Sequence, residues 1–318
     1  MKKQIVLMGA VTLVCWTGWG APLQRADVAA DPAVVAHFDC DGFKTTAIGK
    51  AILAQVNDPD VAGKLNALQA ITSFDPRTQW HGLTCYTTSQ KPDSGVLVLY
   101  ADFESNRLVA LAQTMPGYHC DTNGSHAIYN WIDEQKQAKG GEPHVSAALA
   151  GKRVIFGQSE SAVAGALDVL DGKTPNLAAS GATPDLGLAQ GSIFLQAVVN
   201  KFDFASKDPN SAILKGCKSA RLEVGESGEQ LVANLSFQAS ENDKATQIAA
   251  IAQGLIALGK LQQDNATLLK LANSISIKQD AANVSGTLSI AEAELTDLIK
   301  AGVAQNARNK STNSAPAQ

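Results

Sequence analysis

The stretch Leu231-Val232-Ala233-Asn234-Leu235-Ser236-Phe237-Gln238 alternates between apolar and mainly polar side chains. Because successive side chains of a β-strand point to opposite faces, the odd-numbered apolar residues share one face and the even-numbered residues share the other. A second strand expected at 220–225 precedes it, and Glu226-Ser227-Gly228 supplies the turn. This pattern is typical of antiparallel sheets with one buried and one solvated face. The sequence therefore predicts a sheet that needs cover on one side.

Helical patterns stand on either side of such strands. Ser240 is expected to cap a long helix whose apolar positions recur at helical spacing. Ser105 is expected to cap a shorter helix that follows strands at 80–89 and 96–103. Asn123-Gly124 predicts a hairpin, and a helix is expected over 159–171. The apolar residues of the long helix are Ile248, Ile251, Leu255, Leu258 and Leu261.

The order of expected elements occurs twice along the chain. We predict a first half at 21–175, a linker at 176–190, a second half at 191–302 and a disordered tail at 303–318. Each half reads as antiparallel strands with helices packed mainly on one face, which makes a two-layer α+β unit. The fold prediction is therefore α+β, an internal duplication of two similar halves, with a layout that permits their sheets to join edge to edge.

Residues 1–20 have the pattern of a bacterial export signal. Lys2 and Lys3 give a positive start, an uncharged apolar stretch follows, and Gly18 and Gly20 supply the small residues before a cut at Ala21. We therefore expect a secreted protein, in the periplasm or outside the cell.

Two alternatives for this signal peptide remain open. The apolar stretch could stay as a membrane anchor, although it is shorter than the roughly 20 residues of a spanning helix. A lipoprotein would be attached through Cys15, but Val14 before it is larger than the usual small residue. No later stretch is long and apolar enough to predict membrane insertion after cleavage.

Composition limits the partners. Of the 318 residues, 45% are hydrophobic and only 5% aromatic, and the net charge is −4 without a basic cluster. Nucleic acids and anionic lipid surfaces are bound through basic surfaces, so we exclude both. Motifs for nucleotides, for a nucleophilic serine in G-x-S-x-G and for zinc in H-E-x-x-H are absent from the sequence.

Cysteines leave several possibilities. Cys40, Cys85, Cys120 and Cys217 remain after signal removal, and an oxidising compartment permits disulfides in any of three pairings. Cys217 also fits a buried free thiol. Histidines lie near three of these cysteines. The spacing places His81 and Cys85 on one face of a strand, but the other two histidine–cysteine pairs on opposite faces, and no C-x-x-C occurs. We therefore predict no metal site and no cofactor.

The run Val154-Ile155-Phe156-Gly157-Gln158-Ser159 and the following 166–173 resemble a segment of an uncharacterised family of exported bacterial proteins. The hairpin at 118–131 is similar to the one that precedes this segment in the family. The resemblance covers mainly the middle third of the chain. It implies export and an α+β layout, and it carries no activity, site or cofactor.

The first expected strand, 34–41, contains the strongest candidate site. His37, Asp39 and Asp41 alternate with apolar residues, so a regular strand would place all three on one face. Such a trio could bind a divalent cation or transfer protons. The more common explanation is the polar face of a strand that turns into a helix, and we therefore predict no catalytic residue.

Aromatic residues allow a second kind of site. Trp80 and Tyr86 are six residues apart on one expected strand, and Tyr129 and Trp131 alternate on another, so each pair should share a face. Exposed, they would form a flat surface for a carbohydrate or a protein. Buried, they would supply the bulky part of an alanine-rich core, which is the interpretation we favour.

Together these patterns predict an exported, non-catalytic binding or structural protein of the bacterial envelope, whose partner is an unknown envelope protein or glycan. One alternative is a metal-dependent or hydrolytic enzyme that uses His37, Asp39 and Asp41. Another is a carrier of an apolar ligand between sheet and helices, which a cavity lined by Leu255, Leu258 and Phe237 would favour. A continuous sheet with a broad face would favour the binding protein.

Overall fold

The computed structural model describes residues 22–56, 59–89, 91–141, 143–180, 192–202, 216–262 and 265–297. The expected signal peptide, the linker from residue 181 onward and the expected tail lie outside these residues. None of the helices within the described ranges combines the length and the apolar character needed to cross a membrane.

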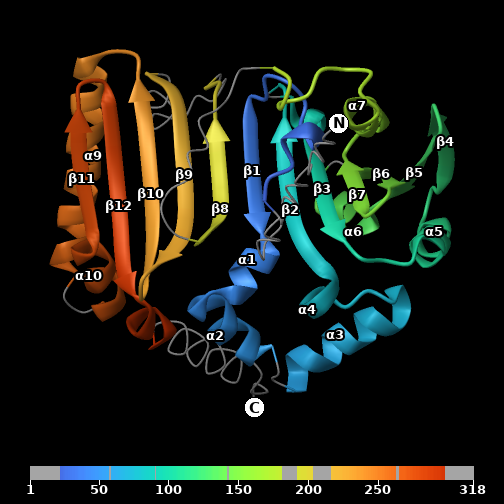
Figure 1. Cartoon of the computed structure of the whole chain (residues 1–318), viewed down its shortest axis with the longest axis horizontal. Coiled ribbons are helices and arrows are strands. Elements are labelled where there is room, and N and C mark those ends of the chain that lie inside the picture. The colour runs from blue at the N-terminus through green and yellow to red at the C-terminus, as the bar shows by residue number, and fades with distance from the viewer. Residues whose placement is uncertain are drawn as a thin grey trace, which may run out of the picture.

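The described strands form one continuous antiparallel sheet of twelve strands, in the order β11-β12-β10-β9-β8-β1-β2-β3-β7-β6-β5-β4 (Figure 1). The first half of the chain supplies β1 (Val34–Asp39), β2 (Trp80–Thr87), β3 (Val96–Ala101), β4 (His119–Asn123), β5 (His126–Ile132), β6 (His144–Ala150) and β7 (Arg153–Gly157). The second half supplies β8 (Ser192–Val199), β9 (Cys217–Ser227), β10 (Gln230–Ala239), β11 (Ile275–Asp280) and β12 (Asn283–Ala291).

The two halves meet where β1 pairs with β8, with Ala36 opposite Ala197. In each half three consecutive strands lie side by side, β1 to β3 in the first and β8 to β10 in the second. The next neighbour in the sheet is the final strand of that half in chain order, β7 or β12. From it to the outer edge the strands follow in reverse chain order. The first half carries two more strands at its outer edge than the second, β4 and β5. The hairpin of β4 and β5 turns at Gly124, whose φ of 62° suits glycine, as the Asn123-Gly124 pair predicts.

Helices and short turns connect these strands. The first half contains η1 (Arg25–Asp27), α1 (Cys40–Thr45), α2 (Ala47–Gln55), α3 (Pro59–Thr72), α4 (Pro76–Gln79), η2 (Pro92–Ser94), α5 (Ser105–Gln113), α6 (Glu134–Ala138) and α7 (Glu160–Leu170). The second contains α9 (Asn242–Leu261) and α10 (Ala266–Asn273), and residues 292–297 are helical. The α+β prediction is confirmed.

Register defines the two faces of the sheet. Val35 lies opposite Tyr86, and Tyr86 lies opposite Val96 of β3; Val98, on the same side of β3 as Val96, lies opposite Ile155. We call this side of the sheet the Val35 face. Ala36 shares the other with Cys85, Leu97 and Phe156; we call this the Phe156 face.

The packed helices are divided between the two faces of the sheet. Helix α7 covers the Val35 face through Val163, Ala166 and Leu167, which join the main hydrophobic core. Helices α5 and α9 contact the Phe156 face, α5 near β5 and α9 near β10 to β12. The alternation of Leu231 to Phe237 belongs to this sheet, with the polar residues of β10 on the Val35 face.

Two boundaries differ from expectation. The first strand ends at Asp39, two residues earlier than expected, because the Asp39 side chain accepts a hydrogen bond from the Gly42 amide and caps α1. The beginning of the expected linker is packed into the first half. Leu177 is 1% exposed within the main core, and its amide donates to the Val28 carbonyl.

Candidate functional site

The structure separates the trio His37, Asp39 and Asp41. His37 is 5% exposed on the Val35 face, and its Nδ1 lies 2.9 Å from the Thr84 hydroxyl. Asp39 caps α1. Asp41 belongs to α1, so it leaves the strand alternation, and its Oδ2 lies 2.8 Å from His81 Nδ1. The expectation that all three share one strand face is therefore wrong for Asp41, because the capping turn redirects the chain.

His37 instead stands at the end of a chain of polar groups inside the first half. Thr84 is fully buried, and its hydroxyl lies 3.4 Å from the Tyr100 hydroxyl. Tyr100 interacts with Asp27, and burial is the main cause that raises the pKa of Tyr100. Asp27 is 4% exposed and accepts from Arg153 Nε at 2.6 Å. The sequence did not predict this role of Asp27, because the residue belongs to no periodic pattern or motif. Only the fold places it beside Arg153 of β7.

His81 joins three elements at the surface. Its Nδ1 contacts Asp41 at 2.8 Å and its Nε2 contacts Asp102 at 3.0 Å, while Lys152 lies 2.7 Å from Asp102. Burial disfavours the charged imidazole, but the hydrogen bonds to Asp102 and Asp41 outweigh it and raise the pKa of His81. Both ring nitrogens are occupied by carboxylates, so this group forms an ion-pair network and leaves no nitrogen for a substrate.

The four cysteines of the described residues are free thiols. Burial raises the pKa of Cys40, Cys85 and Cys217, which keeps them protonated and poor nucleophiles. Cys120 is exposed on the edge strand β4. Cys217 is buried and free, as one of the two interpretations of the sequence allowed.

An apolar cavity of about 150 Å³ lies between α5 and the Phe156 face. No residue of α5 is buried, so the helix covers the strands without sealing them. Five residues of the helical segment and six of the sheet line the cavity, and no charged side chain is among them. They are Leu108, Val109, Leu111, Ala112, Met115, Tyr129, Trp131, Ala147, Leu149, Val154 and Phe156.

A wider groove of about 470 Å³ continues on the same face toward β1. Phe156 lines both spaces, and Ala36, Cys85 and Leu97 extend the groove across three strands. Lys136 stands at its border and is the one charged residue of its lining. The cavity and the groove are two separate hollows on the Phe156 face that share Phe156 in their lining.

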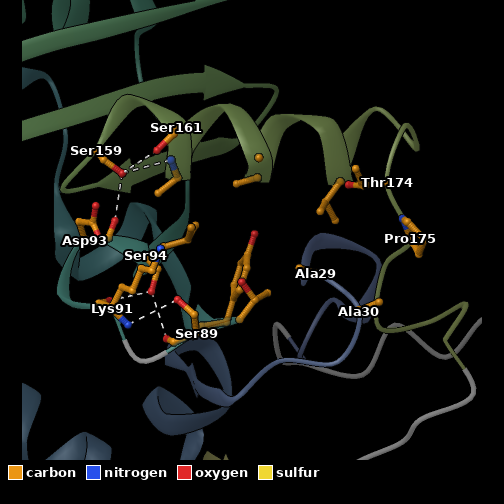
Figure 2. Close-up of a pocket in the computed structure, with 17 residues that line it drawn as sticks. Ala29, Ala30, Ser89, Lys91, Asp93, Ser94, Ser159, Ser161, Thr174 and Pro175 are labelled. Atoms are coloured by element: carbon orange, nitrogen blue, oxygen red, sulfur yellow. Dashed lines mark hydrogen bonds between the residues drawn. The ribbon is translucent and has the colours of Figure 1, made fainter. Parts of the chain in front are cut away.

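A third hollow, of about 570 Å³, lies between α7 and the loop that joins β2 to β3 (Figure 2). It is rich in hydroxyl groups, and several of these bond to one another and to the backbone. The buried Tyr86 hydroxyl, which also belongs to the lining, has no hydrogen-bond partner among the described residues. The Ser159 hydroxyl donates to the Asp93 carbonyl at 3.0 Å, and Ser94 donates to the Lys91 carbonyl at 2.7 Å. The Ser159 bond holds the loop against α7 and the Ser94 bond lies within the loop. Hydroxyl groups that are already hydrogen-bonded do not by themselves indicate a ligand.

The two aromatic pairs differ in whether their members share a face of the sheet. Tyr129 and Trp131 share the Phe156 face and line the cavity beneath α5. Trp80 and Tyr86 do not share a face: Tyr86 belongs to the core of the Val35 face, whereas the Trp80 ring lies 5.9 Å from Phe38. An irregularity in the pairing between Trp80 and Gly82 shifts the register by one residue and reverses the side.

The cavity that would have favoured the carrier alternative is not formed by the residues named for it. Leu255 and Leu258 are 64% and 61% exposed on α9, so they do not enclose a cavity with Phe237. Only Ala245, Ile248, Ala249 and Gly259 of α9 are buried. The structure places an apolar cavity under α5 instead, where the sequence shows a short helix over an aromatic pair.

Comparison with known proteins gives a likeness of fold alone. No family model and no curated protein matches the chain. Solved structures of TP0453 are similar over most of their length. Crystal form III has 11% identity and a TM-score of 0.41, with coverage of 87% of this chain and 97% of that one. Crystal form I has 9% identity and the same TM-score, with coverage of 87% and 96%. A likeness at this level says nothing about what this chain binds.

Proposed function

We propose that this chain is an exported, non-catalytic binding protein that holds an apolar group of a small molecule beneath α5. The observation that carries the proposal is the 150 Å³ cavity with its uncharged lining. A cavity of about this volume lined by Leu, Ile and Phe accepts benzene in a model protein. The cavity therefore suits one ring or the end of a short alkyl chain.

The surroundings explain how such a group could enter and how the rest of the ligand could be held. Because α5 has no buried residue, little apolar contact resists its displacement. The groove beside Phe156 adds about 470 Å³ of mainly apolar hollow. Ligand sites of proteins typically occupy roughly 300–1,000 Å³ and are mostly apolar. Export is supported by the pattern of residues 1–20.

The enzyme alternative loses its basis, because His37, Asp39 and Asp41 serve three separate contacts. A glycan platform loses support as well, because Tyr129 and Trp131 line the cavity beneath α5. The expected envelope-protein partner stays a prediction.

The test uses the fluorescent apolar probe N-phenylnaphthylamine with the chain that begins at Ala21. Ala112 lines the cavity, whereas Ala110 lies exposed on the same helix. Ala112→Leu should fill the cavity and weaken probe binding by about tenfold or more, which corresponds to about 1.4 kcal/mol. Ala110→Leu is the matched control and should leave binding unchanged.

A second variant fills the cavity from the sheet. Ala147 is 5% exposed and lines the same space, so Ala147→Leu should weaken probe binding as Ala112→Leu does. Equal probe affinity in the wild type and in both filled variants would reject the site. Equal losses in Ala110→Leu and Ala112→Leu would show that the probe binds the outer surface of α5.

A further inference from the structure

A second cluster lies away from the apolar cavity, at the edge of the sheet. Strand β4 is the outermost strand of the first half and forms one edge of the sheet, at the right of Figure 1. His119 and Asp121 are two residues apart on it, opposite Asn130 and Ile128, and therefore share the Val35 face. Helix α7 covers this face and begins at Glu160. The fold thus brings Glu160 to the two side chains of β4.

The distances among these side chains suit a shared cation. One ligand atom from each of His119, Asp121 and Glu160 lies within 4.8 Å of the other two. His119 Nε2 and Asp121 Oδ2 are 3.5 Å apart, which is long for a hydrogen bond. Two ligands about 2.1 Å from a tetrahedral zinc ion lie about 3.4 Å apart, so the separation matches two atoms on one ion.

Two of the three ligands are held in place by groups outside the cluster. His119 Nδ1 lies 3.2 Å from the Gly117 carbonyl, which can only accept, so Nδ1 is the donor of this contact and Nε2 is the ring nitrogen that faces the cluster. Asn130 donates to Asp121 Oδ2 at 3.1 Å and accepts from the Ser146 hydroxyl at 2.6 Å. Asn130 and Ser146 are both buried. Such outer contacts are the usual support of metal-binding histidines and carboxylates.

We propose that His119, Asp121 and Glu160 bind a divalent transition-metal ion, with Zn²⁺ as the representative, and that the ion ties β4 to α7. An imidazole nitrogen with two carboxylates suits zinc, whereas Ca²⁺ and Mg²⁺ prefer oxygen ligands alone. Glu160 lies in the first turn of α7, so its carboxylate offsets the positive end of the helix dipole beside the site. A bound ion would hold the edge strand in the sheet.

Calorimetric titration of the mature chain with zinc chloride tests the site. His119→Ala and Glu160→Gln should each weaken zinc binding by more than about tenfold. Both side chains are exposed, so the variants should fold, which equal melting temperatures without metal would verify. His144→Ala removes another exposed histidine, on β6, and should leave zinc affinity unchanged. Magnesium chloride should give no comparable binding.

Amide hydrogen exchange of β4 tests the proposed bridge directly, because zinc binding elsewhere would not slow exchange in this strand. Zinc should slow exchange at the amides of β4 in the wild type and in His144→Ala, but not in Glu160→Gln. The proposal is overturned by a wild type that binds zinc no more tightly than His119→Ala. It is also overturned if His144→Ala weakens zinc binding as much as His119→Ala does. Zinc affinity equal to that of the wild type in Glu160→Gln would overturn it as well.

Discussion

Asp27 is the residue on which the polar interior of the first half depends. It lies in η1, far from β7 in sequence, yet it binds Arg153 and interacts with Tyr100. At 4% exposure the carboxylate has little contact with water. Its removal would leave a guanidinium and a phenol without their acceptor.

We therefore expect Asp27→Ala to lower the free energy of unfolding by about 2–3 kcal/mol. Urea denaturation of the mature chain would measure it. The matched control is Asp31→Asn, because Asp31 also pairs with a cation, Lys201 at 2.9 Å, but its side chain is 71% exposed, and Asn tolerates the positive φ of 53° at this position. That variant should change stability by less than about 0.5 kcal/mol. Similar losses in the two variants would contradict the role of burial.

His81 should make stability depend on pH. Its pKa is raised in the folded state, so folding favours the protonated ring. The contribution is complete below the unfolded pKa of about 6.5 and is lost as pH rises through the raised folded value. The difference in melting temperature between the wild type and His81→Gln should therefore shrink as pH rises above this range.

A proton NMR titration of His81 checks the same point directly. Its midpoint should lie above about 6.5 and should fall in Asp102→Asn, which removes one of the two carboxylate partners. A midpoint at or below the ordinary value would show that burial outweighs the ion pairs.

Helix α9 has more apolar residues than its contact with the sheet can bury, and only one side of the helix packs. Its sequence offers apolar residues around more than half of the helix, and the sheet contacts one side. Ile248 is 8% exposed, next to Ala245 and Ala249, whereas Leu255 is 64% exposed. The small residues allow the helix to approach Val284 and Phe237 closely, so the larger leucines lie outside the contact.

Ile248→Ala should therefore lower the free energy of unfolding by about 2–4 kcal/mol, because it leaves a cavity against the sheet. Leu255→Ala, in the same helix, should change it by less than about 0.5 kcal/mol. Chemical denaturation of the two variants separates these values. A larger loss in Leu255→Ala would mean that the leucine stripe has a contact within the folded chain.

At the scale of the whole molecule, the β1–β8 strand pair joins the sheets of the two halves, and contacts such as Phe43 with Phe194 and the Ala47 amide with Glu226 add to it. Ala197 of β8 lies between Ala36 of β1 and Leu222 of β9, in the middle of the continuous sheet. Trp80 and Trp131 both belong to the first half, so tryptophan fluorescence of the mature chain reports that half. Circular dichroism reports strands and helices of both.

If the shared sheet couples the halves, the two signals should give coincident unfolding curves for the wild type. Ala197→Pro removes a hydrogen bond in a central strand and should cost at least about 2 kcal/mol. It should also separate the two curves. Ala197→Gly keeps the hydrogen bond and should cost about 0.5–1 kcal/mol with the curves still coincident. Separate curves in the wild type would show that the halves unfold independently.

Local patterns in the sequence determined the elements and the α+β class. Alternation over 231–238, the Asn123-Gly124 turn and the Ser159 cap of α7 each depend on neighbours in the chain, and each is present in the structure. The division into domains with a linker stays a prediction, as do cleavage and export. For the sites, the sequence could only propose residues that alternate on one strand.

Tertiary structure decided what depends on distant contacts. The turn capped by Asp39 removed Asp41 from the strand, and the irregularity at Trp80 separated two aromatic residues that an ideal strand would align. The cavity beneath α5 and the cluster of His119, Asp121 and Glu160 join segments that no local period connects. A periodic pattern fixes the face on which a side chain lies, but strand order and helix placement, set by packing of the whole chain, decide what lies opposite it.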